Sequence, residues 1–242
     1  MVQYSAEEVS RFISEIKNPE KLLRGCRIFH KEEPRDLAYI IARKTILENP
    51  KSIYHVVAGA QVLLLIWNSL YIRFLPLKIR QSLEKDLMNA YETVRNDIAL
   101  IEGEKLQSIE LRDSNKADKV CTIFRCFQEH RSVGVTGASK TLHLINPDLF
   151  AMWDSEIRKN FHKLHSDKRH SVDQCYLEFL KQMQEIVKGL LQQRSALEIW
   201  RMYPLHETDP QLVETFSVAS VEPLTKMIDE CNYVRFKFGK DF

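Results

Sequence analysis

Glycine, lysine and aspartate residues with the potential for chemistry follow one another in the second half of the chain. Gly134 and Gly137 fall within four residues, in a chain with 7 glycines, and such a pair favours a tight turn with an unobstructed backbone. Lys140 comes next, and Asp154 follows 14 residues after it. A partly neutral lysine amine is a nucleophile, and a carboxylate stabilises positive charge that develops nearby. Any chemistry is therefore predicted to centre on residues 132–158.

Two helices joined by the glycine turn are expected to position these residues. A helix over about 116–129 carries apolar residues at helical spacing. A second helix is predicted from about 138 to 145, and Asn146-Pro147 stops it, because proline cannot continue a helix. Backbone N–H groups at the start of the second helix can hold a phosphate. The pattern indicates a helix–hairpin–helix motif near residues 117–162.

In this segment the sequence resembles the helix–hairpin–helix base-excision DNA glycosylases, particularly the 8-oxoguanine branch. In that family a glycine hairpin precedes a lysine at the start of the next helix, and an aspartate opens a later helix. Here residues 134–137 occupy the hairpin, Lys140 the lysine and Asp154 the aspartate, although the hairpin spacing is looser than in the family. The resemblance implies that Lys140 attacks C1′ of the deoxyribose to form a Schiff base. It also implies that Asp154 stabilises the sugar cation.

The resemblance further implies contacts with double-stranded DNA that contains a damaged base. Phosphate contacts are expected from the hairpin and from the basic residues that follow it. These residues are Gly134, Val135, Thr136, Gly137, Arg158, Lys159 and Lys163. A base that leaves the duplex needs a stacking surface, for which Trp153 and Phe150 are candidates. No cofactor and no metal site is predicted, because no carboxylate or cysteine completes a ligand set with His162, His165 and His170.

Each of these residues also has a purely structural interpretation. Lys140 can be a first-turn lysine with its charge in solvent, and Asp154 can be only the N-cap of the helix that follows. The basic residues after Asp154 can form a solvated helix face. His143, one turn from Lys140, is expected to be a packing or surface histidine rather than a catalyst.

The rest of the chain predicts an all-α fold, a helical bundle in which strand-type alternation is rare. Ser5 and Glu8 indicate a capping box at the start of the first helix. The nearly all-apolar stretch 52–74 is expected to be one central buried helix, and 172–191 shows a clear helical pattern. The alternating residues 233–238 are compatible with either a short strand or a packed tail.

The 242 residues suffice for a single helical domain, and the polar segment 103–115 is the expected boundary if there are two subdomains. The longest apolar run, 56–67, is too short to cross a bilayer, which takes about 20 residues. The N-terminus has no secretory pattern, and the 5 widely spread cysteines indicate buried thiols in a reducing compartment. We therefore expect a cytoplasmic protein without membrane contact, nucleoid-associated if it binds DNA, with a monomer favoured.

The formal net charge of +2 is too small to select a partner, so any DNA contact must come from local patches. The leading hypothesis is a DNA repair glycosylase, with or without AP-lyase activity, that excises a damaged base such as 8-oxoguanine. One alternative is a non-catalytic helix–hairpin–helix DNA-binding protein in which Lys140 contacts phosphate. Another is a helical protein-interaction module that binds no nucleic acid.

Overall fold

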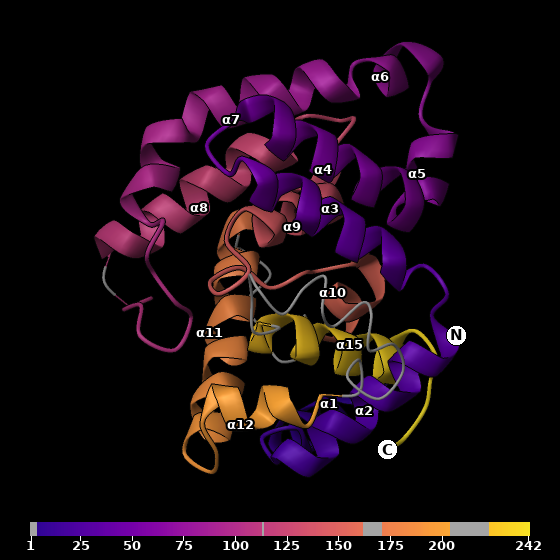
Figure 1. Ribbon diagram of the computed structural model, residues 1–242, viewed down its shortest axis with the longest axis vertical. Coiled ribbons are helices and arrows are strands. Elements are labelled where there is room, and N and C mark those ends of the chain that lie inside the picture. The colour runs from indigo at the N-terminus through magenta and orange to yellow at the C-terminus, as the bar shows by residue number, and fades with distance from the viewer. Residues whose placement is uncertain (1–3, 113, 162–170, 204–222) are drawn as a thin grey trace. The chain divides into compact units, whose positions relative to one another are not determined.

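The computed structural model describes residues 4–112, 114–161, 171–203 and 223–242 (Figure 1). Every regular element in these ranges is a helix, so the prediction of an all-α fold is confirmed. None of the described helices is long and apolar enough to cross a membrane.

The chain forms two compact units, and each unit combines segments that are separate in the sequence. Unit 1 comprises residues 1–34, 155–169 and 179–242, and unit 2 comprises residues 35–154 and 170–178. One long helix, α11 (Val172–Leu191), contributes residues to both units. Its bounds agree with the helical pattern at 172–191 in the sequence.

Unit 2 contains a run of consecutive helices. They are α3 (Asp36–Glu48), α4 (Ile53–Trp67), α5 (Ser69–Phe74), α6 (Leu77–Gln81), α7 (Leu83–Leu100), α8 (Ser114–Gln128) and α9 (Gly134–Ile145). A Cβ on Gly59 of α4 would lie 2.7 Å from the Ala42 carbonyl oxygen of α3, so a larger residue would force these two helices apart. α8 packs against both α7 and α9, and the segment 103–115 lies within this unit, where it joins α7 to α8.

The apolar stretch 52–74 forms two helices, and the prediction of one buried helix is wrong. α4 ends at Trp67, and α5 follows after Asn68. Asparagine is a weak helix former because its side chain competes for backbone hydrogen bonds. Some apolar side chains of this stretch lie in solvent, since Leu65 on α4 is 52% exposed and Phe74 on α5 is 81% exposed.

Unit 1 contains the remaining described helices. They are α1 (Ala6–Glu15), α2 (Pro19–Glu32), α10 (Ser155–Phe161), the later part of α11, α12 (Ala196–Arg201) and α15 (Leu224–Phe236). The capping box is confirmed at the start of α1, because the Ser5 side chain accepts from the Glu8 N–H and the Glu8 carboxylate accepts from the Ser5 N–H. α2 and α15 form the main helix pair of this unit.

The alternating residues 233–238 do not form a strand, because α15 continues through Phe236. Met227, Cys231 and Val234 recur at helical spacing, and all three are fully buried. Residues 233–238 alternate like a strand when they are considered alone. When the earlier turns of α15 are included, the apolar residues show helical spacing. The start of this aromatic–basic run is therefore a packed helix.

Candidate functional site

The connection between α8 and α9 reverses the chain over residues 129–133. The His130 carbonyl accepts hydrogen bonds from the N–H groups of Val133 and Gly134, at 2.9 and 2.8 Å. Gly134 has a φ of +64°, which residues with a side chain rarely adopt. The prediction that the glycines form the turn and that the helix starts near residue 138 is wrong, since both glycines lie in the first turn of α9. The hydrogen bonds to the His130 carbonyl complete the turn at Gly134, so the chain is already helical at both glycines.

Side chains from α5 and α7 hold this turn in place. Asp86 on α7 accepts a hydrogen bond from the hydroxyl of Ser132 in the turn, at 2.6 Å. The Tyr71 hydroxyl on α5 donates to the Arg131 carbonyl at 2.7 Å. A Cβ on Gly134 would lie 2.8 Å from that tyrosine oxygen. Glycine at position 134 is therefore required both for its φ and for the space that Tyr71 occupies.

Lys140 lies in the second turn of α9 and is 4% exposed. Its Nζ donates to the Trp67 carbonyl oxygen at 3.2 Å and lies 5.4 Å from the centroid of the Trp67 ring. Trp67 is the last residue of α4, and the negative end of the helix dipole at this position attracts a cation. The face of the Trp67 indole ring also attracts a cation. The solvent-exposed interpretation of Lys140 is therefore wrong, because this amine is buried and has a partner.

Asp154 directly precedes α10 and is half-buried, in the position of an N-cap residue. Its segment is tied to α9, because the Trp153 N–H donates to the Ser139 hydroxyl at 2.9 Å. Ser139 itself donates to the Thr136 carbonyl at 3.0 Å. Since Ser139 and Trp153 are the direct neighbours of Lys140 and Asp154, this bond joins the two segments that contain the predicted catalytic residues.

The two predicted base-pocket residues are buried in unit 2. Trp153 packs against Phe124 and Tyr176, with ring centroids 6.3 and 5.5 Å away. The rings of Phe124 and Tyr176 are stacked on each other, with centroids 4.0 Å apart. Phe150 is 1% exposed. In this arrangement Trp153 and Phe150 are core residues, and a base could stack on them only if their segment moved.

His143 is fully buried and acts as a packing residue. Its Nδ1 lies 2.7 Å from the Phe150 carbonyl oxygen, and its Nε2 lies 3.0 Å from the Tyr39 hydroxyl. A carbonyl oxygen only accepts, so Nδ1 carries a proton. Both ring nitrogens are engaged within unit 2, which agrees with the structural interpretation of this histidine.

The predicted phosphate-contacting residues belong to different parts of the molecule. Residues 134–137 lie in unit 2, whereas Arg158 and Lys159 lie on α10 in unit 1. Lys159 is exposed and forms an ion pair with Glu156, with an N···O distance of 2.7 Å. Lys163 lies outside the described residues.

A basic and apolar surface lies beside the α8–α9 turn, and the sequence pattern does not reveal it. We call it the α5–α6 surface. Its exposed side chains are Leu70, Arg73, Phe74, Leu77, Lys78, Arg80 and Arg131. Residues 69–82 contain no acidic side chain, and the hydrogen bond from Tyr71 to the Arg131 carbonyl joins α5 to the turn. Because residues 52–74 were expected to form one buried helix, no exposed surface was predicted there.

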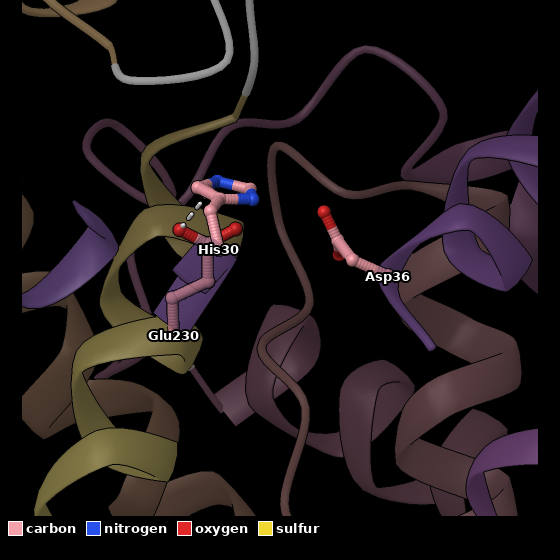
Figure 2. Close-up of side chains that lie close together, drawn as sticks. All are labelled: His30, Asp36 and Glu230. Carbon is pink, nitrogen blue, oxygen red and sulfur yellow. Dashed lines mark ion pairs between the residues drawn. The ribbon is translucent and has the colours of Figure 1, made fainter. Parts of the chain in front are cut away.

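Unit 1 holds a second buried amine, that of Lys226, which is 1% exposed. Its Nζ lies 2.5 Å from Oε1 of Glu230, one turn later on α15, and the Tyr203 hydroxyl donates to the same oxygen at 2.5 Å. His30 lies 2.8 Å from the Tyr203 hydroxyl. It also lies 3.5 Å from Oε2 of Glu230, a contact that Figure 2 marks with a dashed line. Figure 2 also draws Asp36, which belongs to unit 2. Within unit 1 the four connected side chains form a buried polar network.

Comparison with known proteins does not assign the chain to a family. No protein-family model, no curated protein and no solved structure matches it. A function can therefore be inferred only from the residues described above and their geometry.

Proposed function

We propose that the protein is a DNA repair glycosylase that excises a damaged base such as 8-oxoguanine, with Lys140 as its nucleophile. The observation that supports this most directly is a buried lysine amine in a helix that has two glycines in its first turn and begins directly after a tight turn. Asp154, the proposed electrostatic partner, belongs to a segment that is hydrogen-bonded to the same helix through Trp153 and Ser139. We interpret α8, the turn and α9 as a helix–hairpin–helix.

The start of α9 supplies the proposed phosphate contact. Val133 is the N-cap residue, and its side chain makes no capping hydrogen bond. The N–H groups of Val135 and Thr136 have no acceptor within the helix, and both residues are half-buried rather than enclosed. The positive end of the helix dipole lies at the same place, and exposed Arg131 adds a full charge. An anionic DNA backbone is the partner that these groups suit.

The α5–α6 surface supports the same partner. Arg73, Lys78 and Arg80 are exposed and form no ion pair with the described residues, so they are available to phosphates. Phe74 and Leu77 are 81% and 59% exposed. Proteins that bend DNA insert such apolar side chains between base pairs, and extrusion of a base requires the same unstacking. The cations of this surface can contact the phosphates of DNA, and its apolar side chains can contact the stacked bases. Residues 69–82 contain no acidic side chain that would repel the phosphates.

The proposed chemistry uses the amine of Lys140 and the carboxylate of Asp154. The ammonium proton of Lys140 passes to the departing base, which leaves with the electrons of the glycosidic bond, and the neutral amine forms a bond to C1′. Asp154 stabilises the positive charge on the sugar during this step. The adduct then loses a proton and opens to a Schiff base. Lys140 must release the Trp67 carbonyl to reach C1′, so substrate binding has to displace either the lysine side chain or the end of α4.

Borohydride trapping on a panel of lesion-containing duplexes tests the proposal, because borohydride reduces the Schiff base to a permanent cross-link. The wild-type chain should give a cross-link on at least one lesion and none on an undamaged duplex. Lys140→Gln should abolish the cross-link, and Lys44→Gln, at an exposed lysine of α3, should leave it unchanged. A Lys140→Gln protein that traps at the wild-type rate would refute the proposal.

The contact between Lys140 and Trp67 also favours a second candidate, a non-catalytic DNA-binding protein. A lysine that donates to the last carbonyl of a helix stabilises that helix end without any chemistry. In that case the protein binds DNA in a salt-dependent way and gives no cross-link on any lesion. If it binds no DNA at all, a helical protein-interaction module becomes the better interpretation.

A further inference from the structure

Unit 2 contains a cavity of about 240 Å³. It lies where the connection between α3 and α4, the last turns of α7 and the end of α9 meet. This volume corresponds to about eight water molecules at about 30 Å³ each. A single aromatic ring with one small substituent fits within it, because a cavity of about 150 Å³ already holds benzene.

The cavity and Lys140 lie at opposite ends of α4. Pro50 and Lys51 line the cavity and precede the first residue of α4, whereas Lys140 contacts the carbonyl of Trp67, its last residue. A helix of this length rises about 21 Å at about 1.5 Å per residue. A ligand in the cavity is therefore distinct from a substrate at the proposed nucleophile.

One wall of the cavity is apolar and includes a buried phenol. Ile98, Ile145 and Phe150 supply apolar surface. Tyr91 also lines the cavity, is 7% exposed, and makes no hydrogen bond through its hydroxyl with the described residues. Burial raises the pKa of Tyr91 above its usual value of 10.0, so the phenol stays a neutral donor at pH 7. The hydroxyl oxygen is not among the enclosed polar atoms of the described residues, so it can donate to a ligand in the cavity.

The rim of the cavity is positively charged. Lys51 and Arg95 are exposed there and form no ion pair with the described residues, while Glu102 is the acidic side chain of the lining. The lining thus has one more positive than negative charge.

We propose that this cavity is a binding site for a small organic anion, a carboxylate attached to a flat apolar ring. Arg95 and Lys51 would hold the carboxylate, and the Tyr91 hydroxyl would donate to one of its oxygens. The ring would lie against Ile98 and Ile145. The apolar wall disfavours a hydrated inorganic anion, whose solvation it cannot replace, and the net positive charge disfavours a cation. This site is independent of the proposed glycosylase chemistry.

Titration of the full chain with benzoate, followed by NMR or calorimetry, tests the proposal. Benzoate should bind with a dissociation constant of about 1 mM, a moderate efficiency for a ligand of this size. Benzamide has the same shape without the charge and should bind about tenfold more weakly, because charge-assisted hydrogen bonds are the stronger ones. Inorganic phosphate should bind more weakly than benzoate, because it cannot use the apolar wall.

Variants of the lining locate the site. Arg95→Gln and Tyr91→Phe should each weaken benzoate binding by roughly three- to tenfold, the effect of one lost hydrogen bond. Arg131→Gln, at an exposed arginine outside the cavity, should bind benzoate as the wild type does. A thermal melt of each variant verifies that it is folded. The proposal is overturned if the wild type shows no saturable binding, if benzamide binds as well as benzoate, or if neither lining variant changes the affinity.

Discussion

Two buried lysines of this protein are held by different kinds of partner. In unit 1, Lys226 pairs with the carboxylate of Glu230 at 2.5 Å. In unit 2, Lys140 donates to the carbonyl of Trp67 at 3.2 Å. Loss of one member of a buried ion pair costs about 3–5 kcal/mol, whereas a hydrogen bond to a neutral group contributes about 1 kcal/mol. The two amines are similarly buried, and the ion pair of Lys226 is the stronger of these two contacts.

We propose that Lys226 stabilises the fold and that Lys140 reacts. A nucleophile has to leave its resting partner during each turnover, and a helix-end carbonyl holds an amine with less than a full opposite charge. The position in the chain differs as well. Lys226 is joined to the buried polar network of unit 1 through Glu230, whereas Lys140 follows a turn that hydrogen-bonds to Tyr71 and Asp86.

The largest predicted effect is on stability at Lys226. Lys226→Met should lower the free energy of unfolding by about 3–5 kcal/mol, because Glu230 stays buried without its cation. Lys140→Met should lower it by about 1–2 kcal/mol. Urea denaturation at neutral pH measures both values.

A double variant serves as the control for this comparison. Lys226→Met combined with Glu230→Gln should regain part of the loss, because the uncompensated charge is then absent. Equal losses for Lys226→Met and Lys140→Met would remove the distinction between the two lysines.

An intermediate effect is predicted at the turn before Lys140. Gly134→Ala should cost about 1–3 kcal/mol, since the new Cβ meets the Tyr71 hydroxyl and the backbone must keep a φ of +64°. Gly103→Ala is the matched control, because a Cβ there would meet no atom within 4 Å. Thermal or urea unfolding distinguishes the two. If both glycines tolerate alanine equally, Tyr71 and the positive φ do not constrain the turn.

The smallest effect on stability is predicted for the exposed cations, which should instead change DNA binding. Arg131→Gln should alter the free energy of unfolding by less than about 0.5 kcal/mol. It should also reduce the slope of log affinity against log salt by about one, as expected for the loss of one phosphate contact. Fluorescence anisotropy with a short duplex at several salt concentrations measures this slope.

Lys159→Gln on α10 is the informative comparison, because a phosphate contact is expected there from its position in the basic segment after Asp154. If Lys159→Gln reduces the salt slope and Arg131→Gln does not, DNA runs over α10 and the role given to the α5–α6 surface is wrong. If both variants reduce it, DNA contacts residues of both units.

Local signals in the sequence were sufficient to predict several elements. The capping box of Ser5 and Glu8 and the long helix at 172–191 depend on residues a few positions apart, and the structure confirms both. The start of α9 was misplaced for an equally local reason. A pair of glycines is typical of a turn, but the carbonyl of His130 closes this turn before Gly134, so both glycines lie in the helix.

Contacts between distant segments explain why the environment of Lys140 could not be predicted. The residues in its hydrogen bond to Trp67 are 73 positions apart, and those joined by the bond from Tyr71 to Arg131 are 60 apart. Neither pair has a spacing or residue pattern that marks it in a single sequence. The same limitation applies to Trp153, whose aromatic character suits a base pocket as well as it suits the core.

The most direct test of the central claim is the location of the trapped cross-link. After borohydride reduction on the best lesion duplex, protease digestion and mass spectrometry identify the amine that is joined to the deoxyribose. We predict that the modified peptide contains Lys140 and that Asp154→Asn lowers its yield at early times by roughly a hundredfold, the effect of losing one well-placed electrostatic group. A cross-link at another lysine, or none on any lesion, would contradict the assignment of Lys140 as the nucleophile.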